Sequence, residues 1–199
     1  MSLDEYLAWE NEHPLKHEYV AGEVFARSGA SSRHNLISLN IARSLHGAAR
    51  KRGCRIFAND IKLRAGADRI YYPDIIIACG AAASIEYVVE KPSLVVEVLS
   101  RSTRATDRRE KLDAYMKLPS LSSYLIIEQP RRHVLAYARD KQGEWARTEL
   151  TGSSEIRLDF LDTALALDEI YDDVPLPPLE VGEAEDEDWY ELEGEDDAD

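Results

Sequence analysis

The sequence lacks the features that mark disulfide-stabilised, secreted or membrane-spanning proteins. Its 199 residues include only two cysteines, Cys54 and Cys79, which are too few for a disulfide framework or a zinc site. We therefore expect two reduced thiols in a cytoplasmic protein. No apolar run reaches the length of a membrane span, so we expect no membrane association. The acidic start, MSLDEYLAWENEHP, also lacks the basic and apolar regions of a signal peptide.

Basic residues are missing from the end of the chain. Residues 175–199 contain 12 Asp and Glu but no Lys or Arg. The other 26 acids nearly balance the 24 Lys and Arg of residues 1–174, so the net charge of −14 belongs to this tail. A segment this acidic, which opens with three prolines in four positions, cannot bury enough apolar surface to fold alone. We expect one domain over residues 1–174 and an acidic, disordered tail over residues 175–199.

Hydrophobic spacing predicts an α/β or α+β fold around a mixed sheet. Apolar residues three and four apart predict helices over residues 3–12, 33–51 and 106–117. The turn Ala21-Gly22 predicts a short hairpin within HEYVAGEVFA. Two apolar runs are typical of central strands buried on both faces, and the last four strands predict an antiparallel meander. The expected strands span residues 54–64, 70–78, 93–100, 123–129, 133–139, 144–150 and 155–160.

Each of the two apolar runs carries one carboxylate. Asp74 opens the isoleucine run of YYPDIIIACG, and Glu97 stands inside PSLVVEVLS. An unpaired carboxylate in a core costs several kcal/mol, so each must be ion-paired, protonated or bound to a metal. If the strands are neighbours, the two acids converge, and carboxylate oxygens beside water are the ligands that Mg²⁺ or Mn²⁺ takes. Such a metal polarises a phosphate and activates a water, which are two routes to phosphodiester hydrolysis.

A basic helix, STRATDRREKLDAY, follows the second run. Lys111 comes 14 residues after Glu97, so a strand, turn and helix can return it to the carboxylates. There its charge could hold an attacking hydroxide or stabilise charge that develops on the phosphate. The alternative is a surface ion pair with Asp107, four residues earlier on the same helix face. The remaining histidines have no partner pattern and are expected at the surface: His13, His17, His46 and His133.

Four segments together resemble the Uma-two family, which consists of restriction-endonuclease-like proteins of the PD-(D/E)XK nuclease superfamily. They are HEYVAGEVFARSGAS with the following HN pair, CRIFANDIKLR, YYPDIIIACG, and PSLVVEVLSRSTRATDRREKLDAYMKLPSLSSYLIIEQ. The similarity runs from about Leu3 to Val174. It implies a mixed central sheet flanked by helices, with the active site where the central strands diverge. It also implies hydrolysis that leaves 5′-phosphate and 3′-hydroxyl ends.

The resemblance implies a role for each matching residue. Asp74 matches the acid of the Pro-Asp motif, and Glu97 matches the acid of the (D/E)XK motif. The chain departs from the superfamily at the motif lysine, because Leu99 stands in that place. The Uma-two pattern shares this departure, and Lys111 resembles a relocated substitute. The remaining correspondences are Glu18 as a third metal ligand, with Glu23 as the alternative, and His34 as the family's histidine near the site.

The sequence therefore favours a Mg²⁺- or Mn²⁺-dependent nuclease acting on nucleic acid, with DNA as the expected substrate. The residues Asp74, Glu97, Lys111 and His34 would be catalytic, and Glu18, Asp74 and Glu97 would hold the metal. Two alternatives stay open: a module that binds nucleic acid without cutting it, and a partner-binding protein whose carboxylates are only ion-paired. The near-neutral body is the best argument for them. A homodimer is expected of a nuclease that cuts both strands, but no feature fixes one.

Overall fold

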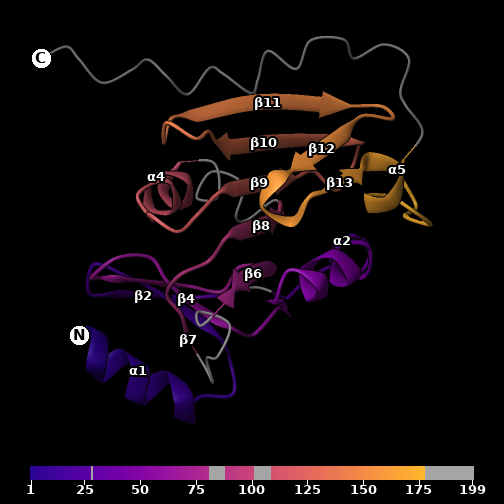
Figure 1. Ribbon diagram of the computed structural model, residues 1–199. Helices are drawn as coiled ribbons and strands as arrows, with labels where there is room; N and C mark the ends of the chain where they lie inside the picture. Colours follow the sequence, from indigo (N-terminus) through magenta and orange to yellow (C-terminus); the bar gives the residue numbers. More distant parts are fainter. Residues whose placement is uncertain (28, 81–87, 101–108, 178–199) are drawn as a thin grey trace, which may run out of the picture.

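A computed structural model describes residues 1–27, 29–80, 88–100 and 109–177 (Figure 1). The predicted acidic tail lies almost entirely outside these residues. The expected start of the basic helix and Asp107 also lie outside them. Within the described ranges, no helix is both long and apolar enough to cross a membrane.

A six-stranded mixed sheet forms the centre of the molecule. Its strand order is β11-β10-β9-β8-β6-β3, and only β8 and β9 pair in parallel among these neighbours. The two apolar runs of the sequence form β6 and β8, which lie side by side and are buried on both faces, as predicted. The strands are β3 (Cys54–Ala58), β6 (Ile75–Cys79), β8 (Leu94–Val98), β9 (Ser123–Ile127), β10 (His133–Arg139) and β11 (Trp145–Thr151).

A second sheet, with order β2-β1-β5-β4-β7, carries the N-terminal part of the chain. Helix α1 (Leu3–Glu12) starts at a capping box in which Ser2 and Glu5 exchange hydrogen bonds, and it packs on this sheet. The predicted hairpin is confirmed as β1 and β2, joined at Ala21-Gly22. The strands are β1 (His17–Val20), β2 (Glu23–Ala26), β4 (Lys62–Arg64), β5 (Arg69–Tyr71) and β7 (Val88–Val89).

Two helices cover opposite faces of the central sheet (Figure 1). Helix α2 (Ser32–Lys51) buries its apolar stripe on one face, where the hairpin β12 (Glu155–Leu158) and β13 (Thr163–Ala166) and helix α5 (Leu167–Ile170) complete the core. The short 3₁₀ helix η2 (Asp159–Leu161) joins β12 to β13. Helix α4 (Glu110–Met116) lies on the other face and packs Tyr115 into the second core.

Two predicted strands are each divided in the structure. The expected strand over residues 54–64 becomes β3 and β4, because Asn59 and Asp60 take left-handed φ angles of 54° and 52°. The expected strand over residues 70–78 becomes β5 and β6, with Pro73 between them, where no N–H is available for a ladder. Each division sends one half into the second sheet, so the two sheets meet beside Asp74.

The expectation of two reduced thiols is wrong. Cys54 and Cys79 are directly opposite each other on the antiparallel strands β3 and β6, and their sulfurs are bonded. The pairing of two strands that are 25 residues apart brings them together. Cysteine spacing alone could not reveal that register.

His133 is also buried rather than at the surface, and His17 is half-buried. His133 begins β10, and its Nδ1 lies 3.2 Å from Glu128 Oε1, while its Nε2 lies 2.5 Å from Glu149 Oε1. Burial alone would raise the pKa of Glu128, but the hydrogen bonds and charges of His133 and Arg131 lower it to about 2. The hydrogen bond to Glu128 raises the pKa of His133. This cluster ties the β9–β10 turn to the edge of the sheet.

Replacement of Glu128 by glutamine is expected to lower the free energy of unfolding most between about pH 5 and pH 6.5. The carboxylate stabilises the fold above its unfolded pKa of about 4.3, and this contribution is lost as the pH falls toward the folded value. The charged imidazole stabilises the fold fully below its unfolded pKa of about 6.5, and its contribution is lost as the pH rises through its raised folded value. We expect a loss of about 2 to 3 kcal/mol near pH 5.5 and a smaller one near pH 3 and pH 9 in urea unfolding. An equal loss at all three pH values would contradict the ionic origin of this stability.

Candidate active site

Asp74 is held at the start of β6 by contacts from three segments. Its Oδ2 accepts a 2.7 Å hydrogen bond from the backbone N–H of Val98 and lies 3.1 Å from His34 Nε2. Its Oδ1 is buried and accepts no hydrogen bond, although Arg27 Nη2 approaches to 3.5 Å. The carboxylate is thus fixed in place through one oxygen, and the other can accept a further partner.

Glu97 lies inside the buried strand β8, on the same face as Asp74. The register pairs Ile75 with Val96, and continuing it by one residue places Asp74 opposite Glu97. Glu97 Oε1 accepts a 2.9 Å hydrogen bond from the Tyr115 hydroxyl and lies 3.2 Å from Lys111 Nζ. These contacts with an ammonium and a phenol from α4 offset the cost of burying the carboxylate in the core.

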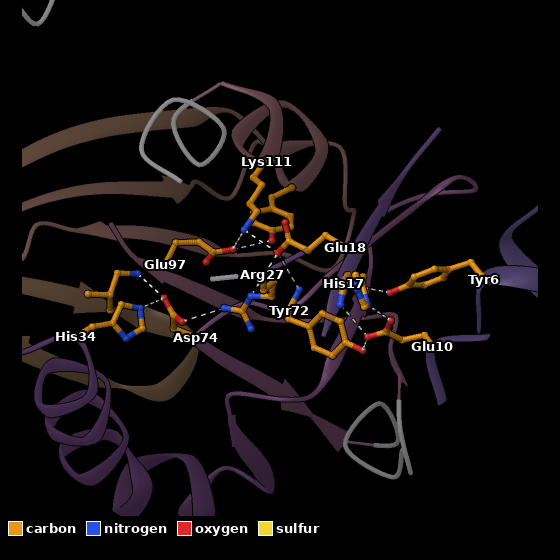
Figure 2. Close-up of polar contacts among 12 residues, drawn as sticks. Tyr6, Glu10, His17, Glu18, Arg27, His34, Tyr72, Asp74, Glu97 and Lys111 are labelled. Atoms are coloured by element: carbon orange, nitrogen blue, oxygen red, sulfur yellow. Dashed lines mark hydrogen bonds and ion pairs between the residues drawn. The ribbon is translucent and has the colours of Figure 1, made fainter. Parts of the chain in front are cut away.

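Lys111 points inward from α4 and is 2% exposed. Its ammonium also lies 3.0 Å from Glu18 Oε1, so it bridges two carboxylates from different sheets (Figure 2). The predicted alternative, a surface ion pair, does not describe a side chain this buried. Its place beside Glu97 is the one that the relocated motif lysine would take.

Glu18 is positioned by the β1–β2 hairpin and by β5. Its Oε1 accepts a 3.3 Å hydrogen bond from the backbone N–H of Tyr72 and lies 3.9 Å from Arg27 Nε. The alternative third acid, Glu23, is exposed at the other end of the hairpin ladder and does not line the cleft described below. Of the two predicted candidates, only Glu18 reaches the other acids.

A buried carboxylate behind Tyr72 supports the position of Glu18. Glu10 accepts hydrogen bonds from the backbone N–H of His17 at 2.9 Å and from the Tyr72 hydroxyl at 2.7 Å. Its Oε2 also lies 3.0 Å from His17 Nδ1, a contact that holds this histidine half-buried (Figure 2). These contacts fasten α1 to β1 and to the residue that follows β5.

The five predicted site residues line one cleft of about 790 Å³, at the junction of the two sheets. Figure 2 shows that their side chains point toward one another from separate elements, with Arg27 between Asp74 and Glu18. The residues are Glu18, His34, Asp74, Glu97 and Lys111. Residues spread over positions 18 to 111 of the chain are thus brought together by strand pairing and the return of α4.

Sequence reasoning missed two residues that contact the acids. Arg27 directly follows β2 and touches both Glu18 and Asp74, yet an arginine after a short strand has no distinctive pattern. Tyr115 packs into the core from α4, and its hydroxyl also reaches Glu97. Burial, and next the charge of Glu97, raises the pKa of Tyr115 well above its ordinary value. The phenol therefore keeps its proton and remains a hydrogen-bond donor to Glu97.

The donor set fits a hard divalent cation that keeps much of its water. Among the residues that the structure describes, no group of three or more His, Cys, Asp or Glu side chains forms a ready-made metal cluster. Mg²⁺ does not need one, because it commonly binds through one or two carboxylates together with waters and substrate phosphate oxygens. Asp74 and Glu97 provide such a pair, and the buried Oδ1 of Asp74 accepts no hydrogen bond.

Comparison with known proteins places the chain in a family. The family model Uma2, described as "Putative restriction endonuclease", matches residues 3–168. Two uncharacterised proteins of Synechocystis sp. are similar. One, slr1290, is 31% identical over 174 residues, which cover 86% of this chain and 91% of the relative. The other, sll1609, is 33% identical over 166 residues, which cover 81% and 94%.

A solved structure shows the same fold. It is a protein of Anabaena variabilis described as a "putative nuclease belonging to DUF820", and the match covers 86% of this chain and 97% of that chain. The TM-score is 0.70 and the sequence identity is 15%. The predicted restriction-endonuclease-like fold is thereby confirmed. With the family model matching most of its length, the chain belongs to the Uma2 family.

Proposed function

We propose that this protein is a metal-dependent nuclease that hydrolyses phosphodiester bonds in DNA. The observation that carries the proposal is the junction of the two sheets. There, two carboxylates from neighbouring buried strands, Asp74 and Glu97, open into one cleft together with a buried lysine. Burying three charged groups is costly and gains little stability, so their retention favours a chemical role. Membership in a family described as "Putative restriction endonuclease" supports the same reaction class.

Asp74 and Glu97 would hold Mg²⁺ or Mn²⁺, with Glu18 as the proposed third ligand. When bound, the metal would supply charge that polarises the scissile phosphate and lowers the pKa of a water. Lys111 would hold the attacking water or stabilise charge on the phosphate, because its ammonium already faces the Glu97 carboxylate at 3.2 Å. His34 would act through Asp74, whose Oδ2 it contacts, by keeping the other oxygen directed at the metal.

Cleavage assays on plasmid DNA and on single-stranded oligonucleotides, with the wild type and Asp74→Asn, test this function. Asparagine keeps the shape of the side chain and can still accept the hydrogen bond from Val98, but it lacks the charge that holds a cation. We expect cleavage with Mg²⁺ or Mn²⁺, none with EDTA, and a rate about 10³-fold lower in the variant.

Two results would overturn the proposal. Binding of DNA and metal with no cleavage of plasmid or oligonucleotides would support the module that binds without cutting. Binding of neither would support the partner-binding protein, in which Asp74 and Glu97 serve only as ion pairs.

A further inference from the structure

The β1–β2 hairpin places an exposed phenyl ring at the edge of the cleft. Phe25 is 50% exposed and packs into none of the three hydrophobic cores of the described residues. Leu15, which is 66% exposed, lines the same cleft. A large apolar side chain left in water within a concave site points to a ligand that covers it.

The strand register sets this ring beside the acids. Phe25 is directly opposite Glu18 in the antiparallel ladder, and Glu18 Oε1 lies 3.0 Å from Lys111 Nζ. Side chains two residues apart share a face of a strand, so Arg27 projects from the same face as Phe25. Across the hairpin, the backbone N–H of Arg27 donates a 2.9 Å hydrogen bond to Lys16, which also lines the cleft. One face of the hairpin thus joins an aromatic ring, two cations and Glu18.

We propose that Phe25 stacks on an unpaired base next to the scissile phosphate, while Lys16 and Arg27 contact the neighbouring phosphates. This inference rests on the nuclease function proposed above and adds its substrate class, which is single-stranded DNA. Bases of a continuous duplex are stacked inside the helix, and a protein reaches only their edges in the grooves. A ring beside the scissile phosphate can therefore stack only on a base that has left the duplex or was never paired.

The charge of the cleft supports the same substrate class. Among the described residues, three basic side chains line it, Lys16, Arg27 and Lys111, against five carboxylates. Duplex binding depends mainly on neutralising phosphates along an extended basic surface, which the described residues of this cleft, with their excess of acid, do not provide. Single-strand binding draws a large share of its affinity from stacking on aromatic rings, so a few cations suffice. The carboxylates are Glu18, Asp60, Asp74, Glu97 and Glu110.

Fluorescence anisotropy with three labelled probes tests the inference: a dT oligonucleotide, a strand of equal length without bases, and a duplex. Titrations in Ca²⁺, with the probes checked for cleavage on a gel, separate binding from catalysis. We expect the wild type to bind the dT strand more tightly than the duplex. We expect Phe25→Ala to weaken binding of the dT strand about 10- to 100-fold and to leave binding of the strand without bases unchanged.

The controls are Phe25→Tyr, which keeps a ring for stacking, and Leu39→Ala, which removes an exposed apolar side chain of α2 that does not line the cleft. Both should bind the dT strand like the wild type.

Equal affinity of Phe25→Ala and the wild type for the dT strand, or tighter binding of the duplex by the wild type, would overturn the inference. If the dT strand binds through Phe25 but neither that strand nor plasmid DNA is cut with Mg²⁺, the nuclease function fails and the stacking site stands. If plasmid DNA is nicked without any effect of Phe25, the reverse holds.

Discussion

Glu97→Gln is expected to abolish metal-dependent cleavage, with a rate at least about 10³-fold below that of the wild type. Glutamine has nearly the same volume, and its side-chain oxygen can still accept hydrogen bonds from Tyr115 and Lys111. What it loses is the negative charge. Because Glu97 is one of two carboxylates proposed to hold the metal, we also expect Mn²⁺ affinity to fall at least about tenfold in calorimetric titrations.

Glu110→Gln is the matched control for this prediction. Glu110 lines the same cleft and also accepts a hydrogen bond from a tyrosine, the hydroxyl of Tyr71 at 2.6 Å. It stands on α4, where its Oε1 lies 4.0 Å from Arg69 Nε, and it is not a proposed metal ligand, so its replacement should change Mn²⁺ affinity and cleavage little. If both variants lose activity equally while keeping the wild-type melting temperature, the acidity of the cleft as a whole matters and the special role of Glu97 is refuted.

The fold could largely be predicted because its elements carry local signals. Nearby residues alone indicate the secondary structure of several segments. Examples are the capping box of Ser2 and Glu5, the periodic apolar face of α2 and the apolar runs of β6 and β8. The pairing of strands could not be predicted in the same way. Two features depend on contacts between residues that are distant in sequence: the disulfide between Cys54 and Cys79, and the division of two strands between the two sheets. The hydrophobic periodicity of a single segment does not specify which strand it pairs with.

The candidate site could be predicted only in part, for the same physical reason. Asp74 and Glu97 stand out because a carboxylate in a run of isoleucine and valine has an obvious cost. Lys111 is ambiguous in sequence, since a lysine on a basic helix fits a surface pair equally well, and the family resemblance selected it. Arg27 and Tyr115 gave no signal, because an arginine after a strand and a tyrosine on a buried helix face are ordinary in those places.

The contacts of the basic residues suggest how the site is kept folded before it binds a metal. Lys111 lies between Glu97 and Glu18, and Arg27 lies between Glu18 and Asp74. Three converging carboxylates would repel one another, and the two cations offset that repulsion. A divalent cation entering the site would compete with them for the same oxygens. Lys111 and Arg27 would then be released toward the phosphate that arrives with the substrate.

Lys111→Met is therefore expected to separate metal binding from cleavage. Cleavage should fall about 10²- to 10³-fold, because a charge that stabilises the transition state is lost. Mn²⁺ affinity should be at least that of the wild type, since a competing ammonium is removed from Glu18 and Glu97. Without metal, the variant should lose about 3 to 5 kcal/mol of stability, because two buried carboxylates lose their cation. Mg²⁺ should restore much of that loss by binding only the folded state, so the melting temperature of the variant should rise more with Mg²⁺ than that of the wild type.

Lys62→Met distinguishes this result from the general effect of removing a buried lysine. Lys62 is 7% exposed and donates to Asn11, but it does not line the cleft. Its replacement should lower the melting temperature without any added response to Mg²⁺, and cleavage should persist. Lys111→Arg restores the charge in a wider, planar group, so it should recover stability more fully than cleavage. Should Lys111→Met bind Mn²⁺ more weakly and melt at the same temperature with or without Mg²⁺, the ammonium would be a structural partner of Glu18 and Glu97, and the placement of the metal between those acids would be wrong.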